Sequence, residues 1–203
     1  MRRLVLAVAF GVCLPAAASA QEKMAVATYT ISFPGSNTKA YIDETSFRGV
    51  QFSVRGAPWR GRPIYVGLTM GWEIFSFETS DPIQLESGTI SGQQRRYLNA
   101  VPMLATVHYY LGNQDSWRVF AGLGVGSIYT LQTFEIGVYS FDQGTWQLGL
   151  APEVGVQVPV TSGTDLYLAG HYDYAFEAGE SLNGDAVAWN YWSIDVGFAW
   201  TGW

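Results

Sequence analysis

The segment from Ile64 to Phe75 alternates between two kinds of side chain, and this alternation constrains the fold more than any other feature. One set is large and apolar and comprises Ile64, Val66, Leu68, Met70, Trp72 and Ile74. The set between them comprises Tyr65, Gly67, Thr69, Gly71, Glu73 and Phe75. A period of two places successive side chains on opposite faces of a β-strand. The sequence therefore predicts a long strand with one strongly apolar face.

The first twenty residues have the features of a secretory signal peptide. Arg2 and Arg3 form a basic start, residues 4–14 are apolar, and residues 18–20 (Ala-Ser-Ala) form a cleavage motif. The apolar run is too short to cross a bilayer as a helix. We therefore expect residues 1–20 to be removed and residues 21–203 to form one exported domain.

The expected mature chain is acidic and has no cysteine. Cys13, the only cysteine, lies in the signal segment, so the mature chain has no disulfide and no thiolate metal site. Without Arg2 and Arg3 the chain has 9 basic and 17 acidic residues, a formal net charge of −8. This charge argues against nucleic acid as a partner.

Segments of period two between turn signals predict eight strands in the mature chain. They span roughly residues 25–33, 46–56, 63–76, 96–111, 117–133, 145–159, 164–176 and 190–201. Long connections (residues 34–45, 77–95, 134–144 and 177–189) alternate with short ones (residues 57–62, 112–116 and 160–163). An even number of antiparallel strands with short turns at one end and long loops at the other is typical of a bacterial outer-membrane barrel.

The direction of the apolar face distinguishes a membrane barrel from a soluble one. A secreted, lipocalin-like binding barrel would turn its apolar face inward. Five or six large apolar side chains from every strand would overfill an eight-stranded barrel, whose interior is only wide enough for a packed core. We therefore predict that the apolar face contacts lipid. Four tryptophans toward strand ends are then expected at the membrane interface: Trp72, Trp146, Trp192 and Trp200.

Several segments of the chain resemble the small outer-membrane β-barrel domain family, which includes barrels of the OmpX, OmpA and OmpW type. They are Tyr29–Phe33 with Thr45–Gly49, Val119–Gly126, Gly149–Val156 and Val196–Trp200. The resemblance covers essentially the whole mature chain and implies an all-β fold, an eight-stranded antiparallel up-and-down transmembrane barrel in the outer membrane of a Gram-negative bacterium. The Phe198-x-Trp200 ending resembles the signal read by the barrel-assembly machinery, which implies this machinery as a partner during biogenesis. Members of the family have varied roles, so the resemblance implies no particular activity.

Four titratable side chains are expected to meet inside the barrel. Glu153, His171, Asp173 and Asp195 all point inward by strand parity and lie at similar heights, counted from the nearest short turn or chain end. Three carboxylates and one histidine require a cationic partner, for which Arg55, Arg96 and Arg118 are candidates. The cluster is interpreted either as a salt-bridge network that plugs the barrel or as a proton-sensitive site centred on His171.

The sequence offers little support for catalysis. His108 and His171, the only histidines, are both predicted to point inward, whereas an enzyme acting on membrane lipid needs catalytic groups on the lipid-facing surface. A Gly-x-Ser-x-Gly nucleophile motif is also missing from the sequence. We therefore expect a monomer that is not an enzyme and holds no cofactor or metal.

Arginines near the outer rim suggest a contact with lipopolysaccharide. Arg48, Arg95 and Arg96 lie close to predicted long loops and could bind its phosphates. The leading hypothesis is an integral outer-membrane protein with a structural or surface-interaction role through its long loops. The alternatives are a narrow channel or carrier for small solutes, and the secreted soluble binding barrel.

Overall fold

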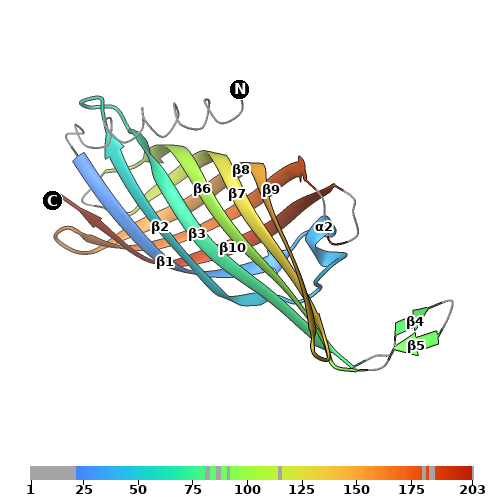
Figure 1. The fold of residues 1–203 in the computed structure, drawn as a ribbon. Coiled ribbons are helices and arrows are strands. Elements are labelled where there is room, and N and C mark those ends of the chain that lie inside the picture. Colours follow the sequence, from blue (N-terminus) through green and yellow to red (C-terminus); the bar gives the residue numbers. More distant parts are fainter. Residues whose placement is uncertain are drawn as a thin grey trace.

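Eight long antiparallel strands close into a barrel because the first strand pairs with the last (Figure 1). This computed structural model describes residues 22–80, 83–85, 88–90, 92–113, 116–179, 182 and 186–202. The predicted signal peptide lies outside these ranges. The barrel strands are β1 (Glu22–Pro34), β2 (Ser46–Ala57), β3 (Ile64–Thr79), β6 (Gln94–Leu111), β7 (Arg118–Ile136), β8 (Tyr139–Thr161), β9 (Thr164–Ala178) and β10 (Val187–Thr201). The predicted eight-stranded up-and-down fold is confirmed.

The two ends of the barrel differ in how the strands are joined. At one end, called the turn end, residues 58–63, 112–117 and 162–163 join the strands, and the outer ends of β1 and β10, near Glu22 and Gly202, lie there too. The opposite end, called the loop end, carries a short helix α2 (Ser36–Lys39) and a small hairpin of β4 (Ile83–Leu85) and β5 (Gly88–Ile90). Among the described residues, no helix is long and apolar enough to cross a membrane.

The connection predicted as a long loop over residues 134–144 is instead part of a β-hairpin. β7 and β8 pair up to Ile136 and Tyr139, which leaves a two-residue turn at Gly137 and Val138. Gly137 has φ +60° and occupies the first central position, where a type II′ hairpin turn favours glycine. The prediction of a loop here was wrong because backbone pairing continues through residues without a clear apolar alternation.

Four strands extend beyond their neighbours at the loop end (Figure 1). β2 pairs with β3 only as far as Glu73, and β9 pairs with β8 only from Gly149 onward. The extensions pair with one another and form what we call the protruding sheet: residues 74–79 of β3, 94–99 of β6, 131–136 of β7 and 139–144 of β8.

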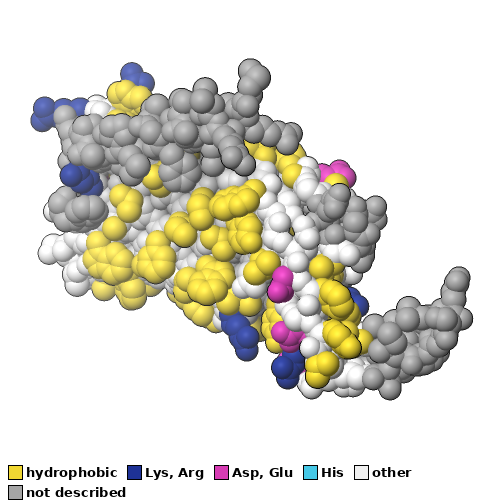
Figure 2. Space-filling model, in the orientation of Figure 1, with side chains coloured by type: hydrophobic (Ala, Val, Ile, Leu, Met, Phe, Trp, Pro, Cys, Tyr) yellow, Lys and Arg dark blue, Asp and Glu magenta, His cyan; other side chains and the backbone are white. Residues whose placement is uncertain are grey.

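The apolar face of the strands points outward, as predicted. Apolar side chains cover much of the described barrel wall seen in Figure 2, and charged side chains are few on it. The four tryptophans predicted at the membrane interface are all exposed: Trp72 by 52%, Trp146 by 57%, Trp192 by 60% and Trp200 by 41%. This orientation is opposite to that of the lipocalin-like alternative.

The interior is layered along the barrel axis. An apolar cluster at the loop end includes Ile42, Phe75 and Leu98, and a second cluster at the turn end includes Met24, Tyr65 and Phe120. Buried polar and charged side chains lie in the barrel with these clusters. Their arrangement forms the candidate site described next.

Candidate functional site

A first polar network, the Arg55–Glu153 network, joins four strands across the barrel near the turn end. Arg55 is fully buried, and its Nη2 lies 3.2 Å from Oε2 of Glu153. The same guanidinium donates hydrogen bonds to the hydroxyl oxygens of Tyr110 and Tyr167, each at 3.0 Å. Tyr167 in turn donates to Glu153. The buried charges therefore compensate each other and are hydrogen-bonded, as burial of an ion pair requires.

A missing side chain on β7 allows His108 to join this network. His108, Gly122 and Glu153 are cross-strand neighbours on β6, β7 and β8, and all three face inward. Nε2 of His108 lies 2.6 Å from Oε2 of Glu153, so the imidazole reaches over Gly122. A Cβ atom at residue 122 would lie 2.2 Å from Cδ2 of His108. Any residue other than glycine would therefore force the imidazole or the backbone to move.

A second polar network, the His171 network, lies between β9, β10 and β1. The imidazole of His171 is placed between two carboxylates: Nδ1 lies 2.8 Å from Oδ2 of Asp195 and Nε2 lies 2.8 Å from Oδ2 of Asp173. Asp195 also accepts hydrogen bonds from Oγ1 of Thr30 at 2.5 Å and from Nε2 of Gln51 at 3.4 Å. The contact of Nδ1 with Asp195 is a hydrogen bond, whereas the contact of Nε2 with Asp173 is close but lacks hydrogen-bond geometry.

Glu73 belongs to the same region but has fewer partners. Its side chain is fully buried, and Oε2 accepts one hydrogen bond from the hydroxyl of Tyr191 at 3.3 Å. Among the described residues, Oε1 of Glu73 has no hydrogen-bond partner. The region thus holds three carboxyl groups and one histidine, so the three carboxyl groups could not all be ionised there with their charge balanced.

The predicted cluster of four residues is therefore divided. His171, Asp173 and Asp195 do come together, but Glu153 bonds instead to Arg55, His108 and Tyr167. The division follows from charge: Arg55 offers Glu153 a full positive charge, whereas His171 is already held by two aspartates. Of the proposed cationic partners, Arg55 takes this role, and Arg118 and Arg96 lie elsewhere.

Sequence reasoning missed several members of both networks. Strand parity places His108, Tyr110 and Tyr167 inward, so their direction could be predicted, but their partners could not. The register between strands decides which inward side chains meet, and that register depends on the tilt of the closed barrel.

An apolar cap closes the interior at the loop end. Ile42, in the segment after α2, is 1% exposed and packs with Phe75, Leu98 and Trp189. Tyr41 beside it packs edge-on against Trp189, with ring centroids 5.8 Å apart. Partial burial raises the pKa of the Tyr41 phenol to about 12, against the opposing effect of the Arg96 guanidinium. The phenol therefore stays protonated at neutral pH and donates to the carbonyl oxygen of Thr133 at 3.1 Å.

The three arginines predicted near the outer rim lie at the loop end and differ in exposure and in the contacts of their guanidinium groups. Arg48 on β2 is exposed. Nε of Arg95 lies 3.0 Å from Oε1 of Glu78, and both side chains are about half exposed. Arg96 stacks over the Tyr41 ring at 5.7 Å and donates to the Tyr41 carbonyl oxygen at 3.4 Å. Arg96 thus holds the cap, whereas Arg48 and Arg95 remain accessible.

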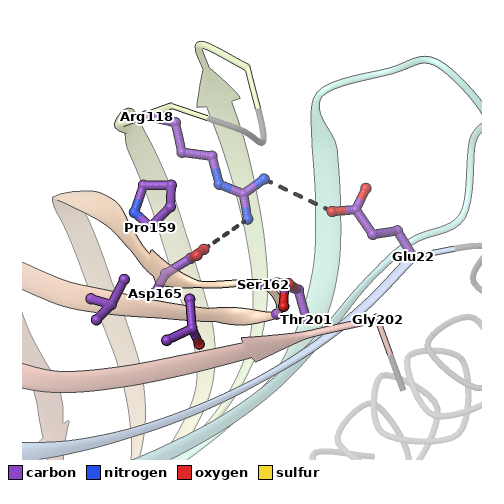
Figure 3. A pocket seen from close by; sticks show the side chains of 10 residues that line it. Glu22, Arg118, Pro159, Ser162, Asp165, Thr201 and Gly202 are labelled. Carbon is purple, nitrogen blue, oxygen red and sulfur yellow. Dashed lines mark ion pairs between the residues drawn. The ribbon is translucent and has the colours of Figure 1, made fainter.

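Arg118 occupies the mouth of the barrel at the turn end (Figure 3). Its guanidinium lies between Glu22 and Asp165, with N–O distances of 3.8 and 3.7 Å. Its Nε donates to Oε1 of Gln157 at 2.8 Å. A cavity of about 520 Å³ opens here, lined by these charged groups, the β8–β9 turn and the end of β10.

The barrel resembles those of several solved outer-membrane proteins, although no protein-family model and no curated protein matches the sequence. A major outer membrane protein from Thermus thermophilus is 16% identical, with a TM-score of 0.55, over 89% of this chain and 99% of that chain. Ail, the attachment invasion locus protein of Yersinia pestis, in complex with the heparin analogue sucrose octasulfate, is 14% identical, with a TM-score of 0.52, over 88% and 98%. The outer membrane protease OmpT from Escherichia coli is 12% identical, with a TM-score of 0.54, over 76% and 63%.

These similar structures have different activities, one of them being a protease, so the common fold does not specify a reaction or a ligand. What they share with this chain is the wall of antiparallel strands. The chain therefore has the closed, eight-stranded fold of the small bacterial outer-membrane barrels.

Proposed function

We propose that this protein is an integral outer-membrane barrel whose role is structural or based on surface interaction at its loop end. The observation that carries the proposal is the outward-facing apolar wall. Large side chains such as Trp72, Leu148 and Ile194 are each more than 40% exposed on it. Such a wall is costly in water but favourable in the hydrocarbon of a bilayer, where a closed barrel also leaves no unpaired strand edge.

The protruding sheet is the feature best suited to contact another surface. In this class of barrel the short turns and the termini face the periplasm and the opposite end faces the exterior, so we expect the sheet to lie outside the cell. Its tip carries Val138, 93% exposed, and Tyr139, 68% exposed. Residues 139–144 of β8 have no strand partner on the β9 side within the described part of the chain, so their backbone is available to pair with an extended segment.

Contact with lipopolysaccharide is proposed for the accessible rim arginines. Arg48 has an exposed guanidinium, and Arg95 is only about half covered by its ion pair with Glu78. Both can donate charge-assisted hydrogen bonds to phosphate oxygens. Arg96 is the weakest of the three candidates because it is already stacked on Tyr41.

Cysteine labelling tests the membrane orientation, because the predicted mature chain contains no cysteine. We expect a Val138→Cys variant to react with a membrane-impermeant maleimide in intact cells. A matched Ser162→Cys variant in the β8–β9 turn should react only after the outer membrane is permeabilised. Equal labelling of both variants in intact cells, or the reverse order, would contradict the proposed orientation.

The channel alternative is tested by conductance. The Arg55–Glu153 network, the His171 network and the apolar cap all cross the interior. We therefore expect no steady channel openings from the purified protein in planar bilayers. Regular openings that persist in independent preparations would instead support a solute path.

Adhesion tests the surface role. Cells that display the protein should be retained on a cultured epithelial layer more than cells without it. A Tyr139→Ser/Phe141→Ser variant should lose this retention while keeping the barrel folded, since both side chains are more than half exposed at the tip. Equal retention of cells with and without the protein would argue against surface interaction and leave the structural role.

A further inference from the structure

The β2–β3 turn carries two arginines that form no ion pair within the described part of the barrel. Arg60 and Arg62 are exposed, and no carboxylate among the described residues pairs with either guanidinium. Both line a cavity of about 340 Å³ at the turn end, next to Arg118. This volume is within the range of roughly 300 to 1,000 Å³ that is typical of small-molecule sites.

The turn that carries the two arginines is conformationally restricted. Gly61 lies between them with φ +71°, and the backbone N–H of Arg62 donates to the carbonyl oxygen of Trp59 at 3.3 Å. Pro58 and Pro63 fix the backbone on either side. A restricted turn loses less conformational entropy when a ligand orders its side chains.

Arg118 provides a third, fixed guanidinium in the same cavity. It is 4% exposed, donates to Gln157 at 2.8 Å and stacks over the Tyr110 ring at 4.7 Å. Its contacts with Glu22 and Asp165 are long, at 3.8 and 3.7 Å. The charged residues in the cavity lining are three arginines and Glu22, so the lining has a formal charge of +2.

We propose that this cavity binds a phosphate group, supplied either by a free phosphate ion or by the headgroup of an anionic phospholipid. The planar guanidinium fork matches the geometry of phosphate oxygens. A free phosphate dianion balances the formal charge of the lining, and the phosphodiester of a headgroup, a monoanion, balances half of it. Trp59, which also lines the cavity and is 52% exposed, offers an apolar surface of the kind found where proteins meet headgroups. The site lies at the opposite end from the protruding sheet and does not depend on the surface role.

Calorimetric titration of the folded protein in a neutral detergent tests for a free ion. We expect saturable binding of inorganic phosphate and little binding of acetate, a monoanion with only one carboxylate. An Arg60→Gln/Arg62→Gln variant should bind phosphate at least about tenfold more weakly, because two charge-assisted contacts are lost. A Lys39→Gln variant removes an exposed positive charge at the loop end, away from the rim arginines, and should bind phosphate normally.

Native mass spectrometry tests for a lipid. Protein taken from nanodiscs of phosphatidylglycerol should retain this lipid, and the Arg60→Gln/Arg62→Gln variant should not, whereas phosphatidylcholine should not be retained by either.

Specific binding in the calorimetric experiment assigns the site to free phosphate, and specific retention in mass spectrometry assigns it to a headgroup. Absence of both, acetate binding equal to phosphate binding, or unchanged binding by the arginine variant would overturn the proposal. If the Arg60→Gln/Arg62→Gln variant does not fold, its unheated sample will migrate in electrophoresis like the heated one. A single Arg62→Glu variant then replaces it in both binding experiments.

Discussion

Two buried glutamates inside the barrel differ in how their charge is compensated. Glu153 contacts Arg55, His108 and Tyr167, whereas Glu73 accepts one hydrogen bond, from Tyr191 at 3.3 Å. A buried carboxylate without a cationic partner costs free energy that its neighbours do not recover. Stability is therefore expected to respond in opposite directions to neutralising the two residues.

Replacing Glu73 by glutamine should raise the free energy of unfolding by about 1 to 3 kcal/mol, since a buried carboxyl group with one hydrogen bond is replaced by an amide of the same shape that does not ionise. Glu153→Gln should lower it, because Arg55 then keeps its charge without a carboxylate. Urea unfolding from lipid vesicles, followed by tryptophan fluorescence, measures both. Glu78→Gln, at an exposed ion pair with Arg95, serves as the control and should change stability by less than about 1 kcal/mol. Destabilisation by Glu73→Gln would show that the native contacts of this carboxyl group are favourable.

A methyl group at residue 122 should separate His108 from Glu153. We expect Gly122→Ala to lower the free energy of unfolding by about 2 to 4 kcal/mol, from overpacking and from loss of a charge-assisted hydrogen bond. Gly170→Ala is a matched control on β9, since a Cβ atom there would meet only the Ser193 carbonyl oxygen, at 3.8 Å. The same urea unfolding assay applies, and equal effects of the two substitutions would show that the space over Gly122 is not needed.

At the scale of elements, the β7–β8 hairpin combines a buried base with an exposed tip. Residues near the base, such as Gly122 and Glu153, take part in the interior, whereas Val138 at the tip is 93% exposed. A Cβ atom at Gly137 would meet nothing within 4 Å. The tip therefore makes little contribution to closing the barrel, and its sequence is free to serve contacts outside it.

An epitope tag inserted between Gly137 and Val138 should leave the barrel folded, because exposed loop tips tolerate insertions. The same tag inserted between Gly124 and Val125, in the middle of a paired strand, should prevent folding by displacing every later residue of β7. Electrophoretic mobility of unheated samples distinguishes folded from unfolded barrels. Loss of folding with the tip insertion would mean that the protruding sheet is required to form the barrel.

At the scale of the whole molecule, the wall and the tip should differ in their tolerance of charge. Leu168→Arg places a cation on the apolar wall and should cost about 2 to 4 kcal/mol if this wall lies in hydrocarbon. Val138→Arg places the same side chain at the exposed tip and should cost almost nothing. Equilibrium folding into vesicles measures both variants, and a harmless Leu168→Arg substitution would contradict insertion of this wall in a membrane.

The sequence was sufficient to predict the number of strands, their antiparallel up-and-down order and the outward direction of Trp72, Trp146, Trp192 and Trp200. These features follow from alternation within each strand, which is a local property. The hairpin at Gly137 was not predicted, because residues 134–144 lack the alternation by which a strand is recognised. The position of the four tryptophans at a membrane interface and the rim contacts to lipopolysaccharide stay predictions.

The alternation from Ile64 to Phe75 determined by itself that one face of the wall is apolar and that Glu73 lies on the opposite face. Barrel volume then determined which face meets lipid, since an eight-stranded interior cannot hold so many large side chains. Only the tertiary structure decided that Glu153 bonds to Arg55 and His108 while His171 contacts Asp173 and Asp195. The physical reason is that strand tilt and register, which closure of the barrel sets, bring distant inward residues to the same height.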